Sequence, residues 1–371
     1  MRPETLDEKL WDELASASGE DLVSIFVPTH RRGREVSQDH ILLKNELSAV
    51  STRLEELGWK PRERSKRLSS VEALLEDREF WEHQDLGLAI YLGEDGSFRA
   101  VALPSPVSAA SHVLGVYLVR QLVRALDKLE VPVLALTRDE AGLFTVTARR
   151  ARPITADLPT YGDVNWFVDR ETQRQQHPGG GTQNRHGHEP SLREDEDLAR
   201  FIREVDSALE DLDLGEPLIV LGDDNLVARY TEVTGREIVS PENSGFSTQL
   251  SVGLVGELSR SSVLDLERRR FESAKQLAEE QIAVGMGTTK IQEAVAAAFT
   301  GRISDVLIDV DADPIWGRID SRTLESEIHE DQRPGDVELL DRLVAWSRRH
   351  GASLSIGTGD PESPFMAVFR Y

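Results

Sequence analysis

Apolar and polar residues in the first part of the chain follow the spacings of strands and helices in turn. The continuous apolar run Val23–Val27 predicts a buried strand, and Pro28 ends it because proline has no amide hydrogen for a strand ladder. A helix near Val71–Trp81 and a strand over Leu86–Leu92 are predicted further along. Before them, three- and four-residue spacing predicts a longer helix, followed by Gly58 as its C-cap. Its apolar stripe consists of Leu43, Leu47, Val50, Leu54 and Leu57.

The middle of the chain predicts a hairpin, a helix and a further strand. Val131–Leu136 and Leu143–Thr147 flank the turn Arg138–Gly142, and this order indicates a β-hairpin. Pro217–Leu221 has the continuous apolar pattern of a fully buried strand. An amphipathic helix lies before that strand. Its apolar face consists of Leu198, Phe201, Ile202, Val205, Leu209 and Leu212.

The last part alternates strands and helices with short links, which is typical of a three-layer α/β domain. Strands are expected over Asp305–Val310, Ser353–Ile356 and Met366–Phe369. Thr288 is expected to cap a first helix, and Gly351 to follow a second. The apolar stripes of the two helices are Ile291, Val295 and Phe299, and Val337, Leu340, Leu343 and Val344.

These elements predict an α/β protein of three domains, since 371 residues are enough for two or three separate cores. The composition changes around Lys128–Glu130, and Phe246–Ile282 is largely helical and rich in charge. We expect an N-terminal α/β domain over residues 1–128, a central domain over 129–262, and a C-terminal α/β domain over 263–371.

A long polar segment interrupts the central domain. From Arg170 to Asp197 the only aliphatic or aromatic residue is Leu192, so the segment can bury little apolar surface and is expected to be a mobile loop. Within it lies Gly179-Gly180-Gly181-Thr182-Gln183. Glycines give a backbone freedom and let it approach another surface closely. A loop of this length inside a compact domain is either functional or a linker.

Composition and charge exclude some classes of function. The chain has 43 Lys and Arg against 66 Asp and Glu, a net charge of −23, and such a field opposes free DNA as a main ligand. The absence of cysteine excludes disulfides and thiolate metal sites. No apolar run approaches the length of a membrane span, and the start lacks the apolar core of a signal peptide. We expect a cytoplasmic protein with no membrane partner.

Basic residues nevertheless cluster in the turn after the first strand. Local contacts of such a patch can reach RNA phosphates, because salt screens the long-range field of the acidic chain. The alternative is a helix-entry turn whose arginines pair with nearby carboxylates. The candidate RNA-binding residues are Thr29, His30, Arg31, Arg32 and Arg34.

Several polar groups could hold a metal ion, but none has the pattern of a metal site. His177, His186 and His188, with Glu189, lie in the polar segment, where a rigid geometry is not expected. Asp309, Asp311 and Asp313 lack the turn glycine and the spacing of a calcium loop. Asp139, Asp223 and Asp224 lie in turns, where Asp is common. We expect neither a metal nor another cofactor.

The order of several motifs resembles a known family. Ser24–Arg31, followed by Gln38-Asp39 and Leu42–Asn45, resembles the opening of the bacterial relatives of archaeo-eukaryotic class I release factors. Gly301–Ile308 and Trp316-Gly317 resemble the third domain of that family. The closing Ala367–Tyr371 resembles the chain end shared with release factors and Pelota proteins. The resemblance spans nearly the whole chain, although none of its motifs is specific alone.

This resemblance implies a central ribonuclease H-like domain, a C-terminal domain of the kink-turn-binding ribosomal-protein type, and a bacterial ribosome or ribosomal RNA as partner. Release factors carry a catalytic Gly-Gly-Gln loop after the central hairpin, where Gly179, Gly180, Gly181 and Gln183 fall here. In this chain Thr182 precedes the glutamine, and the Asn-Ile-Lys-Ser motif that reads stop codons is absent. Stop-codon decoding and efficient peptidyl-tRNA hydrolysis are therefore not expected.

Three classes of function stay open at this stage. The first is a ribosome-associated factor for rescue, hibernation or quality control, with a further protein as a possible partner. The second is a metal-dependent hydrolase or nuclease that uses the acidic or histidine positions. The third is a protein-only adaptor whose acidic surface is the binding face.

Overall fold

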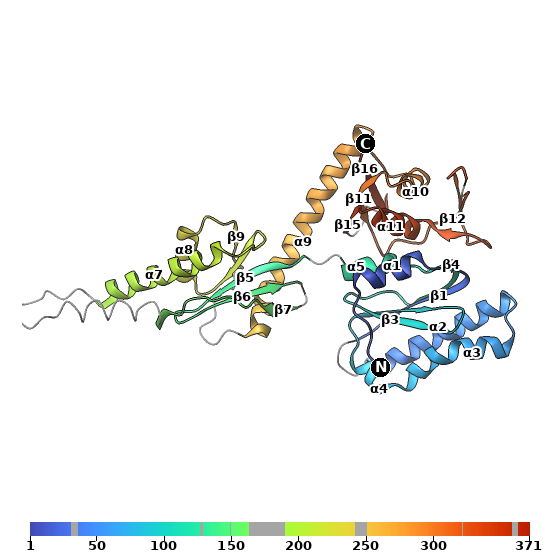
Figure 1. Ribbon diagram of the computed structural model, residues 1–371, viewed down its shortest axis with the longest axis horizontal. Coiled ribbons are helices and arrows are strands. Elements are labelled where there is room, and N and C mark those ends of the chain that lie inside the picture. The colour runs from blue at the N-terminus through green and yellow to red at the C-terminus, as the bar shows by residue number, and fades with distance from the viewer. Residues whose placement is uncertain are drawn as a thin grey trace, which may run out of the picture. The chain divides into compact units, whose positions relative to one another are not determined.

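The computed structural model describes residues 1–30, 36–126, 129–148, 150–162, 190–241, 251–320, 322–357 and 363–371. Contacts within the chain divide it into two compact units (Figure 1). Unit 1 combines Met1–Lys128 with Arg270–Tyr371, and unit 2 is Leu129–Arg269. Both units are built of helices and strands, so the mixed α/β class expected from the sequence is confirmed. The division into three domains with the bounds given above stays a prediction.

The first part of unit 1 is an antiparallel sheet of order β3-β2-β1-β4 with helices on both faces (Figure 1). Its elements are α1 (Glu8–Ser16), β1 (Ser18–Pro28), α2 (Val36–Glu56), α3 (Pro61–Glu72), the 3-10 helix η1 (Ala73–Glu76), α4 (Arg78–Glu82), β2 (Gly87–Leu92), β3 (Phe98–Leu103), β4 (Ala110–Val116), the 3-10 helix η2 (Arg120–Leu122) and α5 (Val123–Leu126).

The central strand β1 is buried on both faces. Successive strand side chains point to opposite faces, so Val23, Ile25 and Val27 pack with the stripe of α2. Leu22 and Phe26 join a second core, which the first part of unit 1 shares with the last part. This double burial is the reason that the apolar run in the sequence is continuous and does not alternate.

The last part of unit 1 has the three layers expected from its alternating pattern. The sheet has the order β10-β16-β11-β15, in which β11 and β15 are parallel and β16 is antiparallel to β11. The helices α10 and α11 share a core with one face of it, and the second half of α9 packs on the other face. The elements are α9 (Val252–Ala283), β10 (Gly287–Thr288), α10 (Ile291–Phe299), β11 (Ile303–Ile308), β12 (Trp316–Ile319), β13 (Ser326–His329), β14 (Val337–Glu338), α11 (Leu339–Arg349), β15 (Ser353–Ile356) and β16 (Phe365–Phe369).

Unit 2 contains the predicted hairpin. β5 and β6 pair with Val131 opposite Val146, within a sheet of order β7-β6-β5-β8-β9. Unit 2 has two hydrophobic cores. In the first, the apolar stripe of α7 packs on the sheet residues Leu134 and Val220. The first half of α9 belongs to the second core. The elements besides α9 are β5 (Val131–Leu136), β6 (Ala141–Val146), β7 (Ala151–Pro153), α7 (Pro190–Glu210), β8 (Leu218–Leu221), α8 (Asp224–Val233) and β9 (Ile238–Val239).

The polar segment expected as a loop through Asp197 is helical from Pro190 onward. Proline fits the first turn of a helix, because its fixed backbone angle suits that position and its missing amide hydrogen has no partner there. The buried residues from Phe201 to Leu209 anchor the helix in the core. Each polar residue before them then extends an existing helix, which adds one backbone hydrogen bond and costs the conformational entropy of only one residue. The expectation was wrong for 190–197, and residues 170–189 lie outside the described residues.

Two further expectations differ from the structure. The helix expected near Val71–Trp81 is interrupted, because the Asp77 carboxylate accepts a hydrogen bond from the Phe80 amide at 3.0 Å and begins the separate helix α4. Thr288 does not cap α10. It lies in β10, and its hydroxyl accepts from the Lys290 amide at 3.0 Å and donates to Glu293 at 2.7 Å.

Buried charged groups join the two parts of unit 1. Asp341 of α11 is 0% exposed, and its Oδ1 accepts from the amides of Val119 at 2.5 Å and Arg120 at 2.7 Å. Its Oδ2 accepts from Nη2 of Arg342 at 2.6 Å, and Arg342 also donates to the Tyr117 carbonyl at 3.1 Å. A buried charge is tolerated when its hydrogen-bonding groups are satisfied. This network therefore fixes how the chain after β4 meets α11.

Arg120 extends the same contact toward Glu338. Its Nη2 donates to the Ala312 carbonyl at 3.0 Å, and its Nε lies 3.8 Å from Oε2 of Glu338. Burial raises the pKa of Glu338, and the neighbouring Arg120 charge opposes that rise. The Gln121 side chain adds a hydrogen bond to the Val310 carbonyl at 2.7 Å. The polar contacts thus run beside the apolar core that both parts share.

His112 of β4 should make unfolding depend on pH. Its ring lies 5.8 Å from that of Trp316, and burial lowers the pKa of His112, with a further lowering from Arg120 against an opposing effect of Asp341. The unfolded chain takes up a proton near pH 6.5, but the folded chain resists it. The free energy of unfolding should therefore fall below about pH 6.5, by at most about 1.4 kcal/mol per pH unit for this group.

Urea unfolding of the wild type and of His112→Gln, at about pH 7.5 and about pH 5.5, checks this expectation. The variant should lose less stability between the two pH values. An equal loss in both proteins would contradict it. Tryptophan fluorescence is a suitable signal because unit 1 contains five of the six tryptophans. They are Trp11, Trp59, Trp81, Trp316 and Trp346.

Gly317 of β12 has no room for a side chain. A Cβ atom there would lie 2.2 Å from the Glu327 carbonyl oxygen and 2.9 Å from Cδ1 of Leu339. Because the first neighbour is backbone, Gly317→Ala should lower the free energy of unfolding by more than about 2 kcal/mol in urea melts. Gly253→Ala is the control, since nothing lies within 4 Å of a Cβ at that position. Equal stability of the two variants would contradict the prediction.

Candidate functional site

Hydrogen bonds to the neighbouring strand fix the start of the turn after β1. Thr29 is 2% exposed, and its amide donates to the Leu86 carbonyl at 3.1 Å. Its hydroxyl donates to the Asp85 carbonyl at 2.9 Å. The sequence analysis placed Thr29 among the RNA-binding residues, whereas the structure places its side chain inside, where it positions the turn.

His30 is held by a buried carboxylate. Asp39, in the first turn of α2, is 0% exposed and accepts from the His30 amide at 2.9 Å through Oδ2. Its Oδ1 lies 2.8 Å from Nδ1 of the His30 ring, and the His30 side chain remains 40% exposed. A carboxylate at Nδ1 fixes the ring orientation and leaves Nε2 for another partner. His30 is therefore an oriented, accessible polar group at the strand end.

Sequence reasoning did not assign a role to Asp39, although Gln38-Asp39 was one of the motifs of the resemblance. An acid in the first turn of a helix is common for reasons of the helix dipole alone. Only the folded chain brings this carboxylate against the backbone and ring of a residue nine positions earlier.

The other predicted site residues lie outside the described residues. These are Arg31, Arg32 and Arg34 of the turn, and Gly179, Gly180, Gly181 and Gln183 of the glycine-rich segment. His177, His186 and His188 lie there too. The described elements on either side of 163–189 are the hairpin β5–β6 with β7, and the helix α7. The glycine-rich segment thus follows the hairpin and precedes the long helix in chain order.

The acidic positions considered for metal chemistry take part in local structure. Asp223 caps α8, and its Oδ1 accepts from the amides of Asn225 at 3.1 Å and Leu226 at 3.0 Å. Asp309 accepts from the Asp311 amide at 2.9 Å, and the Asp311 carboxylate forms an ion pair with Arg124. Among the described residues, no cluster of three or more His, Asp or Glu side chains could hold a metal ion.

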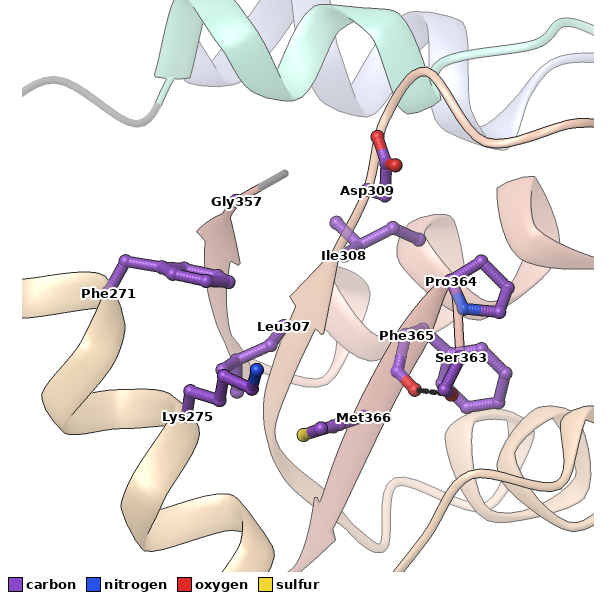
Figure 2. Close-up of a pocket in the computed structure, with 10 residues that line it drawn as sticks. All are labelled: Phe271, Lys275, Leu307, Ile308, Asp309, Gly357, Ser363, Pro364, Phe365 and Met366. Atoms are coloured by element: carbon purple, nitrogen blue, oxygen red, sulfur yellow. Dashed lines mark hydrogen bonds between the residues drawn. The ribbon is translucent and has the colours of Figure 1, made fainter. Parts of the chain in front are cut away.

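A shallow pocket lies between α9 and the sheet of the last part of unit 1. Figure 2 shows Phe271 and Lys275 extending from α9 toward the strands that carry Leu307 and Met366. The Phe271 ring occupies the space where Gly357 has no side chain, since a Cβ there would lie 1.9 Å from Cζ of Phe271. The Ser363 hydroxyl donates to the Phe365 carbonyl at 2.7 Å. The pocket is therefore lined mainly by apolar residues, and its polar groups already have partners within the protein.

In the part of the chain that the structure describes, no helix is both long and apolar enough to cross a membrane.

The described residues define a mixed α/β protein in which His30, whose ring is oriented by Asp39, follows the end of β1. Residues 132–302 match the family model of bacterial archaeo-eukaryotic release factor family 3. The resemblance of the sequence to that family is confirmed over this stretch, which includes the hairpin, the glycine-rich segment and α9. A comparison with curated proteins gives no match.

Solved structures of translation factors are similar to the chain over much of its length. An archaeal translation termination factor, aRF1, is 16% identical over 98% of this chain and 96% of its own, with a TM-score of 0.25. Archaeoglobus fulgidus Pelota is 14% identical over 100% and 94%, with a TM-score of 0.36. Saccharomyces cerevisiae Dom34, a termination-like factor of RNA quality control that interacts with Hbs1, is 14% identical over 76% and 80%, with a TM-score of 0.34. Similarities this weak establish neither a shared activity nor a shared partner.

Proposed function

We propose that the chain is a ribosome-associated relative of translation factors, acting in rescue, hibernation or quality control of bacterial ribosomes. The observation that carries this proposal is the family match over 132–302, which contains Gly179–Gln183 between the hairpin and α7. In this proposal the protein occupies the factor site of the ribosome, and the glycine-rich segment is directed toward the peptidyl-transferase centre.

The sequence of that segment supports a role without efficient peptidyl-tRNA hydrolysis. Hydrolysis by a Gly-Gly-Gln loop requires the glutamine backbone to lie against the ester, and a displacement of about 1 Å is enough to reduce such catalysis strongly. Thr182 stands between the glycines and Gln183, which changes that register. The absence of an Asn-Ile-Lys-Ser motif supports a role without stop-codon decoding.

We assign the ribosomal RNA contact to the turn after β1. His30 supplies the oriented, exposed ring, and Arg31, Arg32 and Arg34 follow it in the sequence. Arginine is suited to phosphate because its planar guanidinium donates two parallel hydrogen bonds. The hydrogen bond from the Thr29 hydroxyl to the Asp85 carbonyl, and that from the His30 amide to the Asp39 carboxylate, fix the start of this turn.

Sedimentation of purified protein with bacterial ribosomes tests the proposal. The protein should pellet with ribosomes at about 50 mM salt and be released progressively toward about 200 mM, because phosphate contacts weaken steeply over this range. If it stays in the supernatant at every salt concentration, the ribosomal role is wrong and the adaptor alternative leads.

Deleting Thr182 tests the catalytic part separately. The deletion restores a continuous Gly-Gly-Gln sequence, so release of a labelled peptide from ribosomal complexes should rise by at least about tenfold over the wild type. The wild type should be close to the rate without factor. Rapid release by the wild type would show that the inserted threonine does not block hydrolysis.

A further inference from the structure

Exposed cations gather where the α10–β11 turn, the end of α11 and the last residues of the chain meet. The group consists of Arg302, Arg349, His350 and Arg370, all of them exposed, and we call it the C-terminal basic patch. Arg370 directly precedes Tyr371, at the chain end marked C in Figure 1. The patch is notable because the chain as a whole has a net charge of −23.

Hydrogen bonds between these segments make the patch a single surface. The Arg370 side chain donates to the carbonyls of Ile303 at 2.8 Å and His350 at 2.6 Å, and its amide donates to the Arg302 carbonyl at 2.8 Å. Gly301, with φ +73°, turns the chain under His350, and a Cβ at Gly301 would lie 3.1 Å from that ring. The turn and the end of α11 therefore lie against each other.

In the part of the chain that the structure describes, no Asp or Glu carboxylate forms an ion pair with Arg302, Arg349 or Arg370. The Arg302 guanidinium lies 5.2 Å from the ring centre of Phe369, which supports its position without using its five N–H donors. Some other arginines of the unit are paired, as Arg348 is with Glu8 and Arg99 is with Glu13.

Aromatic rings border the patch. Tyr371, which follows Arg370, is 72% exposed, and Phe299 at the end of α10 is 46% exposed. The Phe299 ring packs edge-on against Trp346 of α11 with 5.1 Å between ring centres, one turn before His350. Unpaired arginines beside exposed rings are the combination that binds phosphates and stacks on unpaired bases.

We propose that the C-terminal basic patch binds single-stranded or looped RNA, with Arg302 and Arg349 on phosphates and Tyr371 stacked on a base. An acidic protein segment would use the arginines but would gain little from the exposed tyrosine ring, so the observations favour RNA. Helix C-termini also attract cations. That effect contributes to the positions of Arg349, His350 and Arg370, whose side chain donates to the His350 carbonyl at the end of α11, but it does not explain the exposed Tyr371 ring beside them.

The test is fluorescence anisotropy of a labelled single-stranded RNA of about 20 nucleotides with the full-length protein, between about 50 and about 200 mM salt. Each phosphate contact to a single strand contributes about 0.7 to the slope of log affinity against log salt, so Arg302→Gln with Arg349→Gln should reduce that slope by about 1.4. The matched control is Arg53→Gln with Arg78→Gln, which removes the same charge from arginines paired with Glu56 and Glu82.

The tyrosine gives a second, independent readout. Tyr371→Ala should weaken binding about tenfold, whereas Tyr371→Phe should retain it, because stacking needs the ring and not the hydroxyl. The proposal is overturned if the wild type does not bind at about 50 mM salt, if the patch variant keeps the slope of the control, or if a polyglutamate peptide binds the patch better than RNA. The assay contains no ribosome, so its outcome is separate from that of the sedimentation experiment.

Discussion

Replacing Asp341 by alanine should lower the free energy of unfolding of unit 1 by about 3–5 kcal/mol, because it removes one member of a buried charge network. The amides of Val119 and Arg120 would lose their acceptor, and the Arg342 guanidinium would lose its buried counter-charge. Urea unfolding followed by tryptophan fluorescence measures the loss. Hydrogen exchange at the two amides should accelerate even under conditions in which the variant stays folded.

Two further variants sharpen this expectation. Asp341→Asn keeps one oxygen for the amides but removes the charge, so its stability should lie between those of wild type and alanine variant. Asp12→Ala is the control for losing an aspartate of the same unit, since Asp12 is exposed on α1 and should change stability by less than about 0.5 kcal/mol. If Asp341→Ala also changed the free energy of unfolding by less than about 0.5 kcal/mol, the network would not hold the two parts of unit 1 together.

Replacing Arg31, Arg32 and Arg34 by glutamate should abolish sedimentation with ribosomes at about 50 mM salt, if the proposed function is right. Three reversals change the net charge by −6, from −23 to −29, and place negative charge where the proposal has phosphates. The variant should still unfold at nearly the wild-type urea concentration, which would show that the loss of sedimentation does not come from a loss of folding. Gln183→Ala should affect binding much less than the arginine changes.

The matched control carries the same reversals elsewhere on unit 1, at Arg53, Arg62 and Arg78. Its net charge is also −29, so it separates a local contact from the effect of overall charge. The proposal requires that the control still sediments with ribosomes. If both variants are released equally, overall charge governs binding and the turn after β1 is not the contact.

Elements with a strong local pattern could be predicted from the sequence. The run Val23–Val27 lies in β1, and the stripe from Leu43 to Leu57 lies on or at the end of α2. The hairpin β5–β6 was predicted with nearly the observed bounds, because two apolar runs around a turn need only local geometry. The sheet β13-β12-β14 was missed, because β13 has a single apolar residue, Ile328, and therefore no apolar alternation.

The candidate site could be predicted only in part. A basic turn after a strand is visible in the sequence, and the glycine-rich segment was found from its composition. The burial of Thr29 could not be predicted, because it follows from a hydrogen bond to Asp85, which is 56 residues away. The four residues of the C-terminal basic patch lie in three segments, so only their packing makes them one surface.

The sequence by itself determined the mixed α/β class, the order of the main helices and strands, and the similarity to a release factor family, because periodicity and motif order are properties of neighbouring residues. Tertiary structure decided that the first and last parts of the chain form one unit. The contact of Asp341 with Val119 spans 222 residues, and burial of its charge is favourable only where the amides and Arg342 meet it. No local pattern contains that information, since Asp341 and Arg342 alone have the appearance of ordinary surface residues.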